Sequence, residues 1–234
     1  MTGVASPPRA APATTSRFAG LLRVLGWAFI AVGVLVLLYL VYSLLYTNRA
    51  TAQAQSQLEG AWELQLAGGD SSDGAPDAPR TASDDTRTTA GAVAALEFRR
   101  PGTTRPVVHE GPLYVVPGVT LADLQRGPGH YPGTALPGED GNFAVAGHRT
   151  TYGAPFFNLD QLRRGDEVLV TAPDGTRYTY VVRRQEIVDP GETWVLAPDP
   201  LGRGRPLVTL TTCHPRFSAA QRLIVFAELR RDGG

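Results

Sequence analysis

Short runs of apolar residues alternate with polar, Gly- and Pro-rich segments over the C-terminal part of the chain, from about Phe98 onward. β-branched and aromatic residues enrich these runs, which is the pattern of strands joined by turns. The predicted strands are Leu113–Val116, Phe143–Ala146, Glu167–Thr171, Thr176–Arg184, Trp194–Leu196, Leu207–Thr212 and Leu223–Leu229. Short helices are predicted at Leu121–Arg126 and Leu159–Arg164. This pattern is typical of a mostly β fold, a sandwich or a barrel, of about 130 residues.

The N-terminal part carries one long apolar run instead. Residues 24–46 contain no charged side chain, and about 20 such residues span the hydrocarbon core of a bilayer. Trp27, Tyr42 and Tyr46 lie near its ends, where aromatic side chains favour the membrane interface. A cleaved signal peptide is the alternative, but its apolar stretch is shorter and a small-residue cleavage site follows it. The pattern therefore favours a single transmembrane helix.

The charges that flank this run predict its orientation. Arg9, Arg17 and Arg23 precede it without any acidic residue, and Arg49 alone follows closely. Because positive residues favour the cytoplasmic side, we expect a single-pass protein of the cell membrane with a cytoplasmic N-terminus. The predicted organisation is a cytoplasmic tail (1–23), a transmembrane helix (24–46), an extracytoplasmic stalk (47–97) and an extracytoplasmic β-domain (98–234).

The stalk divides into two parts by composition. Residues 50–66 are rich in Ala, Gln, Leu and Glu, which favour a continued helix. Residues 68–92 contain no aromatic side chain and no aliphatic one larger than Ala. Such a segment buries too little apolar surface to offset its ordering entropy, which predicts a flexible linker.

Charge and cysteine content narrow the function. The 22 basic and 22 acidic residues give zero net charge, so nothing indicates a nucleic-acid partner. Cys213 is the single cysteine and can form no internal disulfide. An unpaired thiol is unusual in an oxidising compartment. It is either a small inert hydrophobe or a reactive group.

Two polar residues stand at strand ends like that of Cys213. His148 follows the run Phe143–Ala146, and Arg222 precedes Leu223–Leu229. A nucleophilic cysteine needs a nearby base or cation and donors for the oxyanion of acyl transfer, which His and Arg can supply. A strand-end His is, taken alone, more often a hydrogen-bonded structural residue.

The other histidines are weaker partners for the thiol. His214 follows Cys213 directly, and neighbouring side chains on a strand point to opposite faces, unless the chain turns at Pro215. His109 is expected at the surface or at a strand end. His130 is expected to make hydrogen bonds in a loop.

The motifs Ala146-Gly-His148-Arg and Thr209-Leu-Thr-Thr-Cys213, followed by Arg222, resemble the signature of the sortases, the cysteine transpeptidases of Gram-positive cell surfaces. The anchor, stalk and C-terminal β-domain match the layout of that family. The resemblance covers about residues 107–229. The segment Gly129-His-Tyr-Pro-Gly-Thr-Ala, with Gly141-Asn-Phe after it, is most similar to the actinobacterial class E, with class D next.

The resemblance implies a closed β-barrel of about eight strands with Cys213, His148 and Arg222 as catalytic residues at one end. It implies that Cys213 cleaves an LAxTG- or LPxTG-type sorting signal of a secreted protein between Thr and Gly, forming a thioacyl-enzyme. An amine of the lipid-linked peptidoglycan precursor then accepts the acyl group. His148 is implied as acid and base, and Arg222 as the group that holds the substrate and stabilises the oxyanion.

Three further residues are candidates for substrate binding. Tyr131 falls where sortases line the substrate groove, and in class E a tyrosine in this region accompanies a preference for Ala over Pro in the signal. Thr211 and Thr212 precede the nucleophile, although Thr is a common strand residue.

No metal and no cofactor are expected. Glu139 and Asp140 supply too few oxygen ligands for calcium, and a single thiol does not suit zinc.

Two other interpretations stay open. One is an anchored, non-enzymatic binding or scaffold β-domain in which Cys213 is inert. The other is a different cell-wall cysteine acyltransferase, such as an L,D-transpeptidase. The catalytic cysteine of that family follows Ser-His-Gly, whereas Cys213 follows Leu-Thr-Thr.

Overall fold

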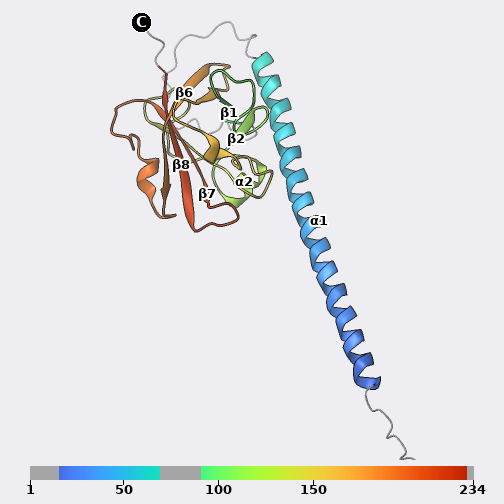
Figure 1. Ribbon diagram of the computed structural model, residues 1–234. Helices are drawn as coiled ribbons and strands as arrows, with labels where there is room; N and C mark the ends of the chain where they lie inside the picture. The colour runs from blue at the N-terminus through green and yellow to red at the C-terminus, as the bar shows by residue number, and fades with distance from the viewer. Residues whose placement is uncertain (1–15, 69–90, 231–234) are drawn as a thin grey trace, which may run out of the picture. The chain divides into compact units, whose positions relative to one another are not determined.

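The computed structural model describes residues 16–68 and 91–230 (Figure 1). The chain forms two compact units, residues 1–43 and residues 44–234. Most of the predicted cytoplasmic tail and of the predicted flexible linker lies outside the described ranges.

Helix α1 (Ser16–Gly68) contains the predicted membrane span and the predicted helical part of the stalk. Within the described residues it is the one helix long and apolar enough to cross a membrane, with a mean hydropathy of 2.7 over its most apolar window. The side chains of that window are exposed to the surroundings. Its length and composition suit a membrane anchor.

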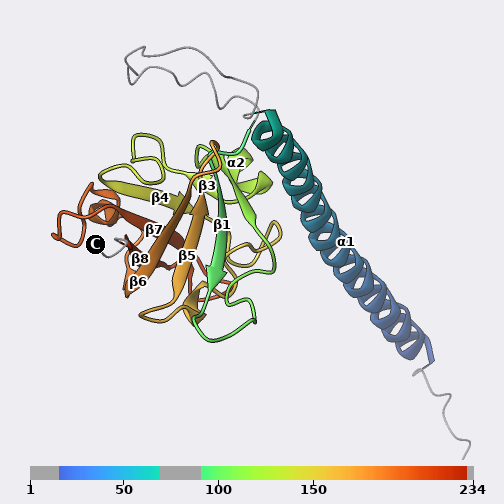
Figure 2. The same cartoon turned by 90° about the horizontal axis from the view of Figure 1, so that it is seen from above.

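Eight strands close into a barrel in the order β1-β2-β3-β4-β7-β8-β6-β5 (Figure 2). The pairs β2–β3 and β4–β7 are parallel, and the other neighbours are antiparallel. The strands are β1 (Ala94–Arg99), β2 (Leu113–Pro117), β3 (Gly129–His130), β4 (Asn142–Ala146), β5 (Glu167–Thr171), β6 (Arg177–Val188), β7 (Leu207–His214) and β8 (Gln221–Leu229). The prediction of a mostly β fold is thereby confirmed, and the closed barrel agrees with the resemblance.

The helices beside the barrel are short. α2 (Leu121–Arg126) has the predicted bounds, because Thr120 and Asp123 form a capping box and Gly127 ends the helix. The second predicted helix is reduced to one 3-10 turn, η3 (Leu159–Gln161).

One predicted strand is wrong. Trp194–Leu196 belongs to the 3-10 turn η4 (Thr193–Leu196), because so short an apolar run fits a buried turn as well as a strand. Strands β1 and β3 were not predicted. β3 has two residues, and its existence depends on its neighbours β2 and β4.

The sheet formed by β4, β7 and β8 has two faces with different coverage. Alternate residues of these strands point into the main hydrophobic core of the barrel, among them Phe143, Val145, Val208, Leu210, Leu223 and Val225. On the outer face Leu207, Ile224 and Phe226 pack against Val195 of η4 and against Val188. This cluster fastens the segment between β6 and β7 onto the outside of the barrel.

The last part of α1 is packed against the barrel. Leu58 and Trp62 are buried with Tyr114, Val116 and Ala95 of β1 and β2. The side-chain amide of Gln55 bonds both the backbone N–H and the backbone C=O of Tyr114, at 2.9 and 3.0 Å. Residues 51–62, in the segment assigned to the stalk, thus contact the barrel within the second compact unit.

Candidate active site

Three strand ends bring the predicted catalytic residues to neighbouring positions. Cys213 near the end of β7 lies directly opposite Arg222 at the start of β8. On the other side of β7, Ala146 of the parallel strand β4 pairs with Thr211. His148 and Cys213 each lie two residues beyond that pair, and the bond from Gly147 N–H to the Thr211 carbonyl, 3.0 Å, continues the ladder toward them. Cys213 and Arg222 thus lie on adjacent strands, and His148 lies just beyond the end of the next strand, β4.

The chain enters the His148 position through a tightly packed glycine. A Cβ at Gly147 would come within 2.6 Å of the Phe156 ring, so no larger residue fits without a shift of that ring. The buried hydroxyl of Thr212 donates to the Gly147 carbonyl at 2.7 Å. The Phe156 N–H donates to the His148 carbonyl at 3.1 Å. These contacts fix the backbone on both sides of the imidazole.

Burial keeps the His148 imidazole neutral. The ring is half-buried, and loss of hydration lowers the pKa of His148 below its usual 6.5, because burial disfavours the charged form. Its Nε2 has no hydrogen-bond partner within the described residues. The ring of Tyr152 lies against it, with 4.9 Å between ring centroids. A neutral imidazole with an uncommitted nitrogen can accept a proton at pH 7.

The thiol and the guanidinium are both accessible. Cys213 is half-exposed and carries a free thiol. Arg222 is also half-exposed, and its Nη1 donates to the carbonyls of Ala219 and Gln221 at 3.0 Å each. These two bonds orient the planar group while engaging one of its nitrogens. The arrangement therefore holds a cation directly across the strand pair from a free thiol.

The comparisons with known proteins agree with this geometry. The sequence model of the sortase domain matches residues 102–230. The chain belongs to the sortase family. Members of this family are cysteine transpeptidases, and the chain contains a single cysteine, Cys213.

Two relatives from Streptomyces coelicolor align over most of this sortase. Sortase SrtE1 is 33% identical over 88% of this chain, and sortase SrtE2 is 31% identical over 89% of it. The chain spans 56% of the length of SrtE1 and 81% of that of SrtE2. These matches support the predicted class E resemblance.

A solved structure shares the barrel. Sortase E of Streptomyces avermitilis is 39% identical over 60% of this chain and 88% of its own, with a TM-score of 0.50.

Arg149 contacts the candidate site but was not singled out from the sequence. Its side chain is buried, and its Nη1 lies 3.3 Å from the Cys213 carbonyl and 3.1 Å from Nδ1 of His214. Its Nη2 forms an ion pair with Asp160 at 3.0 Å, and Asp160 also pairs with Arg216. A guanidinium only donates, so Nδ1 of His214 accepts. Arg149 therefore links the backbone of Cys213 to the segment that follows His148.

The position of Arg149 directly after His148 could have indicated that it lies at the site. A buried arginine could be expected only with a partner, and Asp160 lies in a different part of the loop. His214, the alternative partner for the thiol, instead accepts a hydrogen bond from Arg149.

The three predicted substrate-binding residues separate into two groups. The Tyr131 hydroxyl lies 3.1 Å from Oγ1 of Thr211, and Thr211 is on the same face of β7 as Cys213. Thr212 is on the other face, and its hydroxyl donates a hydrogen bond to the Gly147 carbonyl. Tyr131 and Thr211 thus come together near the thiol, whereas Thr212 supports the backbone before His148.

The remaining histidines have local roles. His130 is buried in β3, where its Nε2 lies 3.1 Å from the Ala135 carbonyl and 3.0 Å from the Thr134 hydroxyl. Burial lowers the pKa of His130. The predicted hydrogen bonding of His130 is confirmed, although in a strand rather than a loop. His109 is half-buried in the loop before β2.

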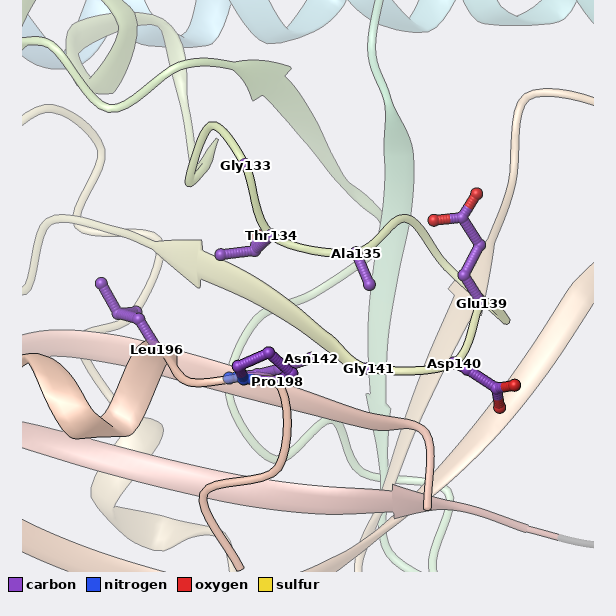
Figure 3. A pocket seen from close by; sticks show the side chains of 9 residues that line it. All are labelled: Gly133, Thr134, Ala135, Glu139, Asp140, Gly141, Asn142, Leu196 and Pro198. Atoms are coloured by element: carbon purple, nitrogen blue, oxygen red, sulfur yellow. The ribbon is translucent and has the colours of Figure 1, made fainter. Parts of the chain in front are cut away.

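A shallow pocket of about 300 Å³ lies beside β4 (Figure 3). Glu139 and Asp140 line it, but their carboxylates point in different directions, and Glu139 accepts a bond from the Leu136 N–H at 2.9 Å. Over residues 16–68 and 91–230, no group of three or more His, Cys, Asp or Glu side chains is arranged to hold a metal ion.

Proposed function

We propose that this sortase is a membrane-anchored cysteine transpeptidase that cleaves an LAxTG- or LPxTG-type sorting signal between Thr and Gly. It transfers the released protein to an amine of the lipid-linked peptidoglycan precursor. The observation that carries this proposal is the placement of Cys213 directly across from Arg222 and next along the sheet from the His148 position. Family membership supports the same reaction type.

Cys213, His148 and Arg222 act as one unit in this proposal. The neutral imidazole of His148 takes the proton of the Cys213 thiol, and the thiolate attacks the carbonyl carbon of the Thr–Gly bond. The tetrahedral intermediate expels the Gly amine, which takes the proton back from His148, and an acyl thioester remains. The acceptor amine then attacks the thioester and gives a proton to His148, and the thiolate leaves and regains its proton from His148.

Arg222 stabilises the charge that develops on the substrate carbonyl. The guanidinium is always protonated and offers several donors in a plane. Its bonds to the Ala219 and Gln221 carbonyls support a fixed orientation, so little reorganisation is needed in the transition state. Tyr131 and Thr211 are proposed to contact the signal peptide beside the thiol.

The proposed location follows from the apolar run and its flanking charges. Residues 24–46 cross the cell membrane, residues 1–23 stay in the cytoplasm, and the domain from residue 98 onward faces outward. A reporter fused to the C-terminus is expected to be active only if it works outside the cell.

A quenched peptide carrying Leu-Ala-x-Thr-Gly tests the proposed reaction. The full chain in detergent micelles, with triglycine as amine, should release the fluorophore and form the transpeptidated product. Cys213→Ala should abolish both, and His148→Ala should reduce them by at least about 10²-fold, the range of general acid–base catalysis. His109→Ala is the matched control and should retain wild-type turnover.

Wild-type turnover in Cys213→Ala would overturn the proposal. A scaffold domain with an inert thiol predicts no turnover in any of these variants and slow labelling of Cys213 by a methanethiosulfonate reagent.

A further inference from the structure

The loop that follows His148 has an unusual backbone. Tyr152, Gly153 and Ala154 all have positive φ angles, of 51°, 73° and 46°. Residues other than Gly rarely adopt this left-handed region, and such strain persists only where surrounding contacts hold it. The loop therefore depends on its contacts for its shape.

Helix α1 supplies one of these contacts directly. The Gly153 N–H donates to Oδ1 of Asn48 at 3.0 Å. Thr51 is also close, because a Cβ at Gly153 would lie 3.3 Å from its methyl group. The barrel-packed end of α1 thus touches the loop at its left-handed centre.

A second route from α1 to His148 runs through Gln125. The buried hydroxyl of Thr51 donates to the Gln125 carbonyl at 2.7 Å. The Gln125 side-chain amide donates to the Tyr152 hydroxyl at 3.3 Å. The Tyr152 ring in turn lies 4.9 Å from the His148 ring. Thr51 thus contacts Gln125, Gln125 contacts Tyr152, and Tyr152 packs against His148, so a displacement of Thr51 should change the position of the imidazole.

The surroundings of these bonds are open. A cavity of about 440 Å³ separates α1 from the barrel here, and Asn48, Thr51, Tyr152 and Gly153 line it. Gln55 also bonds across this gap, but to Tyr114 and Arg126 rather than to the loop. The individual bonds of Asn48 and Thr51 therefore matter more for the loop than they would in a filled interface.

We propose that Asn48 and Thr51 of α1 are positioning residues that hold the 148–156 loop, and through Tyr152 the imidazole of His148, in its working orientation. The inference rests on the proposed acid–base role of His148. It extends the role of α1 beyond anchoring, because the same helix takes part in shaping the catalytic loop.

Asn48 and Thr51 act on His148 through its position rather than through an electric charge. Neither Asn48 nor Thr51 carries a charge. The titratable or charged groups at or next to the His148 position are Arg149 and Tyr152 on the loop itself, Cys213 and His214 on β7, and Arg222 on β8. Loss of the bonds from α1 should therefore lower the rate through misplacement of the imidazole.

The test compares variants of the full chain in detergent micelles. Asn48→Ala combined with Thr51→Val should lower kcat by about 10-fold to 10²-fold, with KM changed by less than about 3-fold, as for a misplaced catalytic group. Thr51→Ser keeps the hydroxyl and should restore most of the rate lost in Thr51→Val. Gln57→Ala, an exposed change on the same helix, is the matched control with wild-type kcat.

A second readout does not depend on turnover. With ¹³C-labelled histidine, the His148 resonance should shift in the double variant and in Thr51→Val, while the His130 resonance stays in place and reports an intact barrel. Absence of turnover in the wild type would contradict the proposed function alone. Unchanged kcat together with an unchanged His148 resonance would overturn the positioning role, and if the double variant unfolds, Thr51→Val alone decides the matter.

Discussion

The inner and outer faces of the sheet formed by β4, β7 and β8 differ in what their side chains do. On the inner face Leu210 and Val225 are fully buried in the main core. On the outer face, at the ends of the same strands, lie Cys213 and Arg222, both half-exposed. Strand alternation directs core residues inward here, whereas farther along the outer face Leu207, Ile224 and Phe226 are buried under η4. The core can hold the strand ends still while Cys213 and Arg222 remain accessible, so changes at Leu210 and at these two residues should have different consequences.

The largest expected effect on the inner face concerns stability. Leu210→Ala should lower the free energy of unfolding by about 2–5 kcal/mol, because it removes buried methyl groups and leaves a cavity. Cys213→Ala, in a half-exposed position on the outer face, should change it by less than about 1 kcal/mol. Denaturant unfolding of the two variants checks the contrast. Equal losses of stability would mean that the faces are not separated in this way.

Substitutions at the half-exposed residues of the outer face should lower the rate of peptide turnover. Arg222→Ala is expected to reduce kcat/KM by about 10²-fold to 10³-fold, the range for losing an oxyanion donor. Arg222→Lys should recover only part of it, since an ammonium lacks the planar set of donors. Stability should stay near that of the wild type in both variants. Peptide turnover and unfolding are measured side by side, and a kcat/KM of Arg222→Ala within 3-fold of the wild type would remove this residue from the mechanism.

Thr212 combines both kinds of effect. It lies on the inner side, yet its hydroxyl supports the Gly147 carbonyl next to His148. Thr212→Val keeps the shape but leaves a buried acceptor unsatisfied, which should cost about 1–3 kcal/mol of stability. Turnover should fall as well, whereas Thr212→Ser should retain most of both. A stable Thr212→Val variant with normal turnover would show that the bond is dispensable.

The smallest expected effect is the dependence of stability on pH. The folded-state pKa of His148 lies below the unfolded value of about 6.5. The unfolded chain therefore binds a proton first on acidification, so stability is full above pH 6.5 and is lost as pH falls through the folded pKa. One such proton contributes a slope of at most about 1.4 kcal/mol per pH unit. His148→Gln should show a shallower loss as pH falls below about 6.5, and an identical slope would contradict the lowered pKa.

Sequence reasoning predicted the strands that contribute most to the site. β7 and β8 are rich in β-branched residues, so their positions were predicted to within about two residues at each end. β1 escaped notice because its residues, AALEFR, include no β-branched side chain. β3 depends on a close approach of backbones, since a Cβ at Gly129 would lie 2.1 Å from the Gly118 carbonyl oxygen. Such contacts between segments cannot be read from local periodicity.

For the candidate site, the sequence indicated the three candidate catalytic residues but not the residues that hold them in place. Cys213, His148 and Arg222 could be chosen because each has a chemistry-bearing side chain at a predicted strand end. The support around them could not be chosen from sequence. Arg149 is explained by Asp160, and the His148 loop by contacts from Asn48, about a hundred residues earlier. Asp160 lies in the 3-10 turn η3 and Asn48 in helix α1, so neither contact can be read from the pattern around His148.

Trapping the acyl-enzyme tests whether Cys213 is the nucleophile. The full chain in detergent micelles is mixed with a Leu-Ala-x-Thr-Gly peptide without any amine acceptor, quenched in acid and analysed by intact and digest mass spectrometry. We expect Cys213 to carry the acyl group of the peptide that ends at Thr, a mass one water less than that of the free fragment; hydroxylamine should remove it, and Cys213→Ala should lack it. Cleavage of the peptide without an adduct on Cys213, or with the adduct on another residue, would contradict this role of Cys213.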